Sequence, residues 1–445
     1  MMGRQNTPPQ MFYDFRLDDH VPAGHLLRKV DAVLDIEAIR PQLAALYSPI
    51  GRPSIDPELM IRMLLIGYLY GIRSETRLCD EIHLNLAYRW FCGLGLDGRV
   101  PDRSSFSKNR HGRFTGGDML RCVFEMVVKQ CDEAGLVGGE GAAVDGSTIE
   151  ADANRDRRCA PTEAVERWAA EETHTRAVAA YLEDLATAAD PAPDEPRRKA
   201  PKYLSETDPQ AAWSLKDGPG RFSYETNYLI DDRHGIIMDV EATPARLSQE
   251  IIAAKAMLTR SRARVGFAPK TLGADKSYGT GPFLAWLVEH NVEPHVPVLD
   301  RKRQTDGKIT RDAFQYDADR DRYICPQGHG MALTGIHAPT GVKQYKAPAK
   351  ACQNCPIRPS CTDGRQRSVT RLIHEEVREK VQALATTEAF AETRRKRKKV
   401  EMLFAHLKRN MGLRRLRLRG LAGAAEEFLL AATAQNLRRL VKLNA

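Results

Sequence analysis

Hydrophobic positions recur at helical spacing through the first third of the chain, between stretches of polar residues. Asp56 followed by Pro57 is typical of a helix start, because aspartate caps free N–H groups and proline suits the first turn. The apolar run that follows predicts a buried helix over 59–72. The same spacing predicts further helices over 75–90 and 119–134.

A short segment between the last two of these helices is rich in small polar and basic residues. It starts at Asp102, a helix-capping residue, and carries Arg103, Ser105, Lys108 and Arg110. Such a helix start suits contact with a DNA backbone or groove, as in helix-turn-helix modules. An ordinary amphipathic surface helix explains the same composition equally well.

The hydrophobic pattern then changes from helical spacing to short runs of small and β-branched residues. The first run, 141–150, indicates a buried strand with Asp145 in its middle. The later pattern predicts strands over 222–230, 235–241, 269–274 and 293–298, and helices over 246–264, 282–291 and 375–408. Helices interleaved with a mixed sheet predict an α/β fold.

The chain length of 445 residues allows two to three domains. We predict a helical domain over 1–135 and an α/β domain over 136–445. Two stretches have the composition of insertions into the second domain. One, at about 151–221, holds a charged helix and a proline-rich linker over 191–201; the other, at about 300–371, is polar and carries a cysteine cluster.

Composition and charge narrow the range of functions. Apolar residues make up 42% and charged residues 28% of the chain, which excludes collagen-like, disordered and disulfide-stapled proteins. Nine cysteines, several of them isolated, favour a reducing cytosol, and we expect no signal peptide and no membrane span. The net charge is +9, yet 394–419 alone holds twelve Lys or Arg and one acid. That concentration predicts a polyanionic partner such as nucleic acid, although a solvated basic face gives the same pattern.

Three acids stand where a mixed sheet would gather them. Asp145 lies in the first strand, Asp275 follows the strand over 269–274, and Glu401 is the single acid of the basic segment. Converging carboxylates repel one another and need cations between them, so the cluster predicts a hard-metal site, with Mg²⁺ the default. Two such ions activate an attacking oxygen and stabilise a leaving one in phosphodiester chemistry. Taken singly, Asp145 and Asp275 also fit plain turns.

Helical geometry groups Glu401 with cations. At roughly 100° per residue, Arg394, Arg397, Glu401 and Lys408 share one face of a helix. The neighbouring face is apolar and suited to packing on a sheet. The helix is therefore expected to present a metal-binding acid flanked by phosphate-binding cations. The simpler alternative is an i to i+4 ion pair between Arg397 and Glu401.

The spacing Arg397-x3-Glu401-x6-Lys408 resembles part of the Y-R-E-K signature of DDE transposases encoded by bacterial insertion sequences of the IS-four/IS-five superfamily. At the tyrosine position of that signature the chain has Arg394, which is able to contact a phosphate but supplies no phenol. Other segments similar to the family occur in the same order, between about residues 12 and 440: Trp90-Phe91-Cys92-Gly93-Leu94, Val100-Pro101-Asp102-Arg103-Ser104-Ser105-Phe106-Ser107, Val144-Asp145-Gly146-Ser147 and Gly273-Ala274-Asp275-Lys276-Ser277-Tyr278-Gly279.

The resemblance implies a ribonuclease-H-like mixed sheet flanked by helices, in which Asp145, Asp275 and Glu401 bind two Mg²⁺ or Mn²⁺ ions. It also implies cleavage at transposon ends and strand transfer into target DNA, by a cytoplasmic, nucleoid-associated enzyme that is at least a homodimer when it holds two ends. Two alternatives stay open: a nuclease on the same scaffold without strand transfer, and a DNA-binding regulator that has lost activity. The residues expected to contact double-stranded DNA are Arg394, Arg397, Lys408, Arg409, Lys276, Arg103, Ser105, Lys108 and Arg110.

The cysteine cluster is a second candidate site. Cys325 precedes the spacing Cys352-x2-Cys355-x5-Cys361, with His329 nearby, in a polar segment that has little core of its own. Four thiols in such a segment predict a structural, tetrahedral Zn²⁺ site, in which His329 is an alternative to one thiol. Reduced free cysteines and a disulfide are the other interpretations. A cysteine-bearing insertion also resembles one seen in some members of the transposase family.

Overall fold

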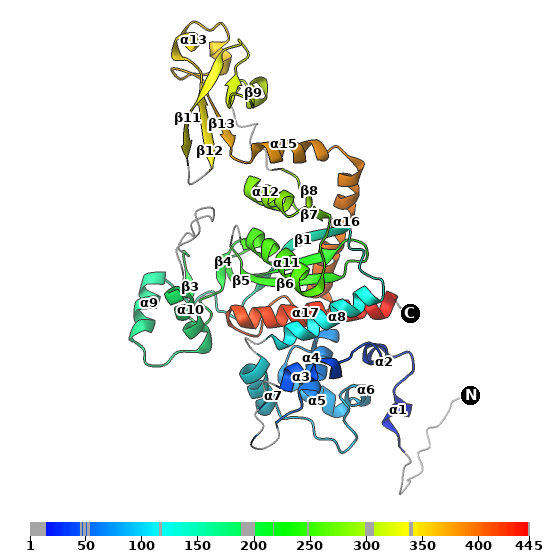
Figure 1. The fold of residues 1–445 in the computed structure, drawn as a ribbon. Coiled ribbons are helices and arrows are strands. Elements are labelled where there is room, and N and C mark those ends of the chain that lie inside the picture. Colours follow the sequence, from blue (N-terminus) through cyan, green and yellow to red (C-terminus); the bar gives the residue numbers. More distant parts are fainter. Residues whose placement is uncertain are drawn as a thin grey trace, which may run out of the picture.

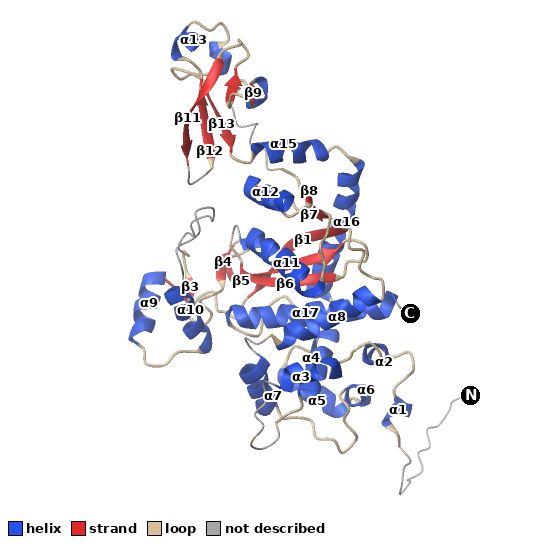
Figure 2. Cartoon of the chain, viewed as in Figure 1, coloured by secondary structure: helices blue, strands red, loops and turns tan. Residues whose placement is uncertain are grey.

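The chain folds around a mixed β-sheet with helices on both faces (Figures 1 and 2). The computed structural model describes residues 15–44, 47, 50, 54–114, 118–187, 201–216, 218–246, 249–298, 307–337 and 341–443. The predicted α/β class is confirmed: the sheet contains antiparallel and parallel pairs, and helices precede, interrupt and follow it.

Strand order in the main sheet is β4-β5-β1-β7-β8. β6 pairs with the same edge of β5 as β4, with β4 along residues 221–223 and β6 along residues 224–230. β1, β5 and β6 form an antiparallel meander, while β7 pairs in parallel with β1, and β8 in parallel with β7. The bounds are β1 (Gly141–Glu150), β4 (Ala212–Ser214), β5 (Arg221–Asp231), β6 (Ile237–Pro244), β7 (Thr271–Gly273) and β8 (Glu293–His295). β5 is buried along nearly its whole length because helices cover both of its faces.

Helix α11 (Gln249–Val265) covers one face of this sheet, and α16 (Glu388–Arg409) and α17 (Gly420–Leu443) cover the other. α17 is largely buried, so its polar residues need partners inside the protein. Asn436 exchanges hydrogen bonds with the backbone of Ile237 at 2.9 and 2.8 Å. Among the described helices, none is long and apolar enough to cross a membrane.

Of the amino-terminal helices, α8 lies beside α17 next to the sheet, and the others lie on the far side of α17 and α8 from the sheet (Figure 1). Asp56 caps α4 as predicted, since its side chain accepts from Glu58 N. The single helix predicted over 75–90 is wrong, because Asn85 accepts from the N–H groups of Ala87 and Tyr88 and starts a new helix. These elements are α1 (Leu17–His20), α2 (Leu26–Asp31), η1 (Glu37–Ile39), α3 (Arg40–Ala44), α4 (Pro57–Leu69), α5 (Glu75–Leu84), α6 (Leu86–Phe91), α7 (Arg103–Asn109), η2 (Arg110–Phe114) and α8 (Met119–Glu133).

The first predicted insertion forms a small lobe beside the sheet. Its charged segment is two helices, α9 (Pro161–Ala170) and α10 (Arg176–Thr187), rather than one. They pack on a two-stranded sheet of β2 (Arg158–Cys159) and β3 (Leu204–Ser205), around a cluster that includes Trp168. The proline-rich linker over 191–201 lies outside the described residues except for its last position.

The second predicted insertion is a five-stranded antiparallel sheet that projects from the main body (Figure 1). Contrary to the expectation of little core, Phe314, Tyr323, Met331 and Tyr345 are buried together in it. The sequence did not predict this core because several of its members are tyrosines, whose hydroxyl groups made the segment look polar. Its elements are η4 (Arg311–Ala313), β9 (Gln315–Asp317), β10 (Arg322–Ile324), β11 (Gly330–His337), β12 (Val342–Lys346), α13 (Ala349–Gln353), α14 (Arg358–Cys361) and β13 (Ser368–Leu372).

The helix predicted over 375–408 is also two helices, α15 (Glu375–Leu384) and α16. Thr387 separates them, because its hydroxyl accepts from Phe390 N and caps α16. The remaining elements near the sheet are the 3₁₀ turn η3 (Lys276–Tyr278) and α12 (Gly281–Glu289). The break turns α16 away from α15 and directs it across the sheet (Figure 2).

Replacing Phe404 by alanine tests how α16 is held on the sheet. Phe404 is buried and stacks on Tyr228 of β5, with ring centroids 4.8 Å apart. We expect Phe404→Ala to lower the free energy of unfolding by about 3–5 kcal/mol, measured by chemical denaturation. Met402 on the same helix is 65% exposed, so Met402→Ala is the control and should change that free energy by less than about 0.5 kcal/mol. Equal losses in the two variants would contradict the packing described.

Candidate active site

Two acids lie side by side where the parallel strands β1 and β7 meet. Their register ends with Ala143 beside Gly273, and Asp145 and Asp275 stand two residues further along each chain segment. Neighbouring strands are about 4.8 Å apart. The sheet therefore brings together two carboxylates that are distant in the sequence.

An arginine of α16 joins the third acid to Asp145. Arg397 donates from Nη1 to Asp145 Oδ2 at 3.0 Å and from Nη2 to Glu401 Oε1 at 3.0 Å. Its guanidinium thus lies between a strand carboxylate and a helix carboxylate and balances the charge of both. The i to i+4 pair considered from the sequence is present, but Arg397 also reaches β1. The side chain of Arg397 is 21% exposed and that of Glu401 is 55% exposed, so the bridge opens to solvent.

Aromatic packing beside Asp145 sets the position of α16. Tyr228 is directly opposite Asp145 in the β1–β5 register, and its ring stacks on Phe404. The Tyr228 hydroxyl donates to Gln435 Oε1 of α17 at 3.1 Å. The same contacts that bury the apolar side of α16 therefore place Arg397 and Glu401 above the strand.

Asp275 is held at one of its two oxygens. Oδ1 caps the turn η3 by accepting from the backbone N–H of Ser277 at 2.8 Å, and it lies 2.5 Å from the Ser277 hydroxyl. Asp275 Oδ2 has no hydrogen-bond partner among the described residues. One carboxylate oxygen is therefore fixed, and the other remains available to a ligand.

Two further acids stand beside Asp145 and Asp275, and the sequence analysis missed both. Glu250 of α11 lies 2.9 Å from the Ser277 hydroxyl and accepts from Lys216 Nζ at 3.1 Å. Glu225 of β5 accepts from the same Lys216 at 2.8 Å. Alternation on β5, where Ser223, Glu225 and Asn227 interrupt a buried apolar run, was a signal that could have drawn attention to Glu225. Glu250 carried no such signal.

The concentration of negative charge changes how Asp145 ionises. Burial raises the pKa of Asp145 to about 6, the nearby Arg397 guanidinium opposes that rise, and the charges of Asp275 and Glu250 add to it. Burial also raises the pKa of Glu225, against the effect of Lys216. Both acids are thus harder to ionise than free carboxyl groups, and the cations next to them favour their charged forms.

The basic segment is divided between the site and the fold. Lys399 donates to the backbone carbonyl of Asp232, and Lys396 pairs with the carboxylate of Asp232 at 3.5 Å, so these two anchor the helix. Arg394 and Arg409 are exposed. Lys408 is half-buried and lines a cavity. Lys276 is exposed on η3 next to Asp275.

The other residues predicted to contact DNA lie on α7 and, for Arg110, at the start of η2, in the amino-terminal helical region. Arg103 and Lys108 are exposed and Ser105 is half-buried there. Arg110 is a correction. It is only 6% exposed and its guanidinium is paired with Glu75 at 3.2 Å and Glu426 at 3.8 Å. It ties α5 to α17 inside the protein and is not presented to DNA.

The cysteine cluster lies at one end of the five-stranded sheet. Cys325 follows β10, Cys352 and Cys361 belong to α13 and α14, and Cys355 lies between those helices. Burial, together with the other three thiols of the cluster, raises the pKa of the Cys361 thiol. All nine cysteines are free thiols in the structure, so the disulfide interpretation is not supported.

Metal ligation in this conformation is limited by the protein's own cations. Within the part of the chain that the structure describes, no three His, Cys, Asp or Glu side chains form a group that could hold a metal ion. At the acids, Arg397 lies between Asp145 and Glu401, and Lys216 lies between Glu225 and Glu250. An ion that binds between Asp145 and Glu401 would displace Arg397, and one between Glu225 and Glu250 would displace Lys216.

Comparison with known proteins identifies two segments. Residues 15–112 match the family described as Transposase domain (DUF772), and residues 324–441 match the family described as Transposase DDE domain. The second match includes Arg397 and Glu401. A cryo-EM structure of a piggyBac transposase synaptic complex with hairpin DNA aligns with 9% identity and a TM-score of 0.32, covering 94% of this chain and 78% of that one.

The bridge made by Arg397 is testable through the titration of Asp145. The guanidinium favours the charged carboxylate, so Arg397→Gln should raise the pKa of Asp145 above its value of about 6. Carboxyl carbon shifts followed by NMR over a pH series measure this. Arg395→Gln is the control, because Arg395 pairs with Glu388 on the exposed side of the same helix. An unchanged or lower pKa in Arg397→Gln would show that Arg397 does not neutralise Asp145.

Proposed function

Because the chain is a DDE transposase of the insertion-sequence type, an enzyme that cleaves DNA and transfers strands, we propose that Asp145, Asp275 and Glu401 are its metal-binding triad. The observation that carries the proposal is the single guanidinium of Arg397 spanning Asp145 and Glu401, with Asp275 directly after the adjacent parallel strand β7. DNA is the partner of such an enzyme. The proposal assigns the chemistry to one edge of the sheet.

The donor set suits a divalent ion. All three candidate ligands offer carboxylate oxygens, which hard cations such as Mg²⁺ and Mn²⁺ prefer. The raised pKa of Asp145 also indicates a buried negative charge that a cation would stabilise. When two such ions are bound, they supply charge neutralisation and Lewis acidity at the scissile phosphate. We propose Mg²⁺ or Mn²⁺ in this role.

The chain's own residues then have separate tasks. Arg397 neutralises the acids in the free protein and is close enough to turn toward a phosphate of bound DNA. Arg394, Arg409, Lys408 and Lys276 offer further cations around the acids. In the first step a water oxygen forms a bond to phosphorus and the 3′-oxygen leaves as a hydroxyl. In the second, that 3′-hydroxyl loses its proton and forms a bond to a target phosphorus, while the target's own 3′-oxygen leaves and takes up a proton. Positioning and charge stabilisation are sufficient for both steps.

Topology supports a ribonuclease-H-like core as a further part of the proposal. An antiparallel meander of β1, β5 and β6 is followed by β7 and β8, added in parallel on the other side of β1. We propose this core over 136–445, interrupted by the two insertions, and a DNA-binding helical domain over 1–135 that uses Arg103, Ser105 and Lys108 of α7. A homodimer that holds two transposon ends, and residence near the nucleoid, complete the proposal.

Substituting the strand acid tests the triad. We expect Asp145→Asn to reduce Mg²⁺-dependent cleavage of a duplex carrying the inverted repeat beside the gene by about a thousandfold or more. Asp156→Asn is the control, since that carboxylate is 84% exposed and remote from the acids. Cleavage that persists in Asp145→Asn would reject the triad, whereas no Mg²⁺-dependent cleavage by the unaltered protein would favour the DNA-binding regulator. A joining assay with a pre-cut end separates the remaining alternative, because a simple nuclease does not insert that end into a second duplex.

We also propose that Cys325, Cys352, Cys355 and Cys361 hold a structural Zn²⁺. Support comes from the mutual influence of the four thiols at one end of a small sheet and from the turn at Cys325, where the backbone N–H of Cys325 bonds His329 O at 2.9 Å. Such turns present a thiolate toward a tetrahedral ion. The metal would fix α13 and α14 to the end of the sheet.

Metal analysis of protein purified without chelators tests this site. We expect about one equivalent of zinc per chain, falling to near zero in Cys352→Ser. Cys122→Ser is the matched control, because Cys122 is an isolated thiol in α8 and should leave the zinc content unchanged. Less than about a tenth of an equivalent in the unaltered protein removes the zinc proposal and leaves four reduced cysteines.

A further inference from the structure

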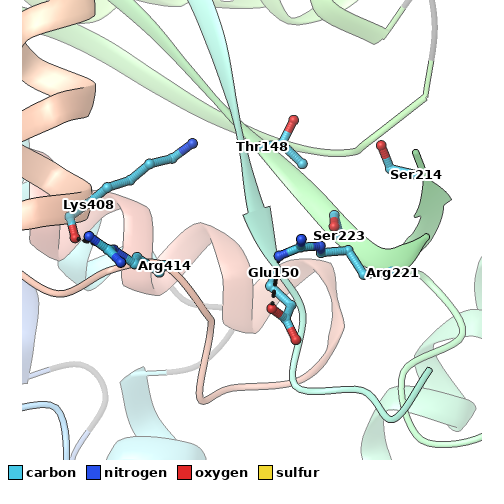
Figure 3. Close-up of a pocket in the computed structure, with 7 residues that line it drawn as sticks. All are labelled: Thr148, Glu150, Ser214, Arg221, Ser223, Lys408 and Arg414. Carbon is cyan, nitrogen blue, oxygen red and sulfur yellow. Dashed lines mark hydrogen bonds and ion pairs between the residues drawn. The ribbon is translucent and has the colours of Figure 1, made fainter. Parts of the chain in front are cut away.

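A cavity of about 270 Å³ opens where β1 and α16 continue past the three acids (Figure 3). Thr148 lies three residues beyond Asp145 on β1, and Lys408 lies seven residues beyond Glu401 on α16. Both displacements are about 10 Å. The cavity therefore lies further along both elements than the acids. Because side chains alternate along a strand, Thr148 is on the face of Glu225, its partner in the register, and not on the face of Asp145. The cavity is lined by Thr148, Glu150, Ser214, Arg221, Ser223, Lys408 and Arg414.

Two hydroxyls that line this cavity are buried without a hydrogen-bond partner. Thr148 Oγ1 and Ser223 Oγ are both inaccessible to solvent and unbonded among the described residues, and Ser223 as a whole is 0% exposed. They lie on the same face of adjacent strands, since Glu150 pairs with Ser223 and Thr148 with Glu225. A buried donor without an acceptor destabilises the folded protein. A change of side-chain rotamer would turn both hydroxyls into the cavity, where a ligand that accepts hydrogen bonds would satisfy them.

The charged side chains of the cavity identify that ligand as an anion. Lys408, Arg414 and Arg221 contribute three cations against the carboxylate of Glu150, which leaves a net charge of +2. Arg414 is oriented by donating from Nε to the backbone carbonyl of Lys408 at 3.2 Å. Glu150 forms ion pairs with Arg221 at 3.4 Å and with Arg415 at 3.7 Å. The carboxylate of Glu150 shows that arginines at this cavity already bind one anionic group. Cations with convergent hydroxyls are the usual partners of phosphate oxygens.

We propose that this cavity binds a backbone phosphate of the DNA strand that passes over the three acids, within about three nucleotides of the scissile phosphate. The inference rests on the proposed function, because the acids define where the strand is cut. The separation of about 10 Å corresponds to roughly three nucleotides of rise in B-form DNA. Thr148 and Ser223 donate to the phosphate oxygens, and Arg221, Arg414 and Lys408 balance its charge. Lys408 was expected to contact DNA; Thr148, Ser223, Arg221 and Arg414 are new assignments.

The test removes the two hydroxyls together in the full-length chain. Thr148→Val/Ser223→Ala deletes donors that lack partners in the free protein, so its thermal stability should equal or exceed that of the unaltered protein. Its affinity for a duplex carrying the inverted repeat beside the gene should fall at least about tenfold, measured by fluorescence anisotropy in Ca²⁺. Ser261→Ala is the control, since that buried hydroxyl lies outside the cavity and bonds Leu258 O at 3.2 Å; it should leave affinity unchanged.

Neutral phosphates locate the contact. Duplexes with one methylphosphonate at each position within three nucleotides of the cut should bind the unaltered protein several-fold more weakly at one position, and the double variant should be insensitive at that position. If the affinity losses from the methylphosphonate and from the double substitution simply add at every position, the proposal is overturned. Unchanged affinity in the double variant also overturns it. Inorganic phosphate is the second probe: binding of free phosphate to the cavity without coupling to any DNA position also overturns it.

Cleavage assays in Mg²⁺ keep this inference separate from the proposed function. A protein that cleaves DNA but shows no coupling between the hydroxyls and a phosphate retains its triad and lacks this phosphate site. A protein that shows the coupling, yet cleaves equally well as Asp145→Asn, has the phosphate site and a different catalytic group.

Discussion

Gathering several carboxylates at one edge of a sheet is the constraint on which the rest of this structure depends. Asp145, Asp275, Glu225 and Glu250 approach one another from two strands, a turn and a helix, and their mutual repulsion must be balanced. Arg397 and Lys216 provide that balance in the free protein, each spanning two acids. Under the proposed function, displacing either cation would offer a pair of carboxylate oxygens to a divalent ion.

Keeping those charges in register requires a rigid support. Helix α16 is fixed by the stack of Phe404 on Tyr228, directly opposite Asp145, and by the buried helix α17 behind it. α17 in turn joins the sheet to the amino-terminal helices, partly through the buried ion pairs of Arg110 and the pairing of Arg73 with Glu427. Removing a partner from such a buried pair leaves an uncompensated charge, so these contacts stabilise one arrangement of the two regions.

The basic residues of segment 394–419 have different roles. Lys396 and Lys399 hold the helix to Asp232, whereas Arg397 and Lys408 face the acids and the adjoining cavity. Helical periodicity separates these roles, because residues one or two positions apart point in different directions. The net charge of the segment therefore overstates the number of cations available to DNA in a transposase of this kind.

The sequence by itself determined the α/β class, the strand that carries Asp145, the capped helix start at Asp56 and the face shared by Arg397 and Glu401, because each follows from local periodicity or capping. It misjudged the continuity of three helices, where Asn85, Thr387 and the loop after α9 introduce breaks, and it assigned Arg110 to the surface. Only the tertiary structure decided that Asp145 and Asp275 are neighbours, that Glu225, Glu250 and Lys216 join them, and that Thr148 and Ser223 line a cavity. Those relations depend on strand pairing between distant segments, and local pattern carries no information about which distant segments pair.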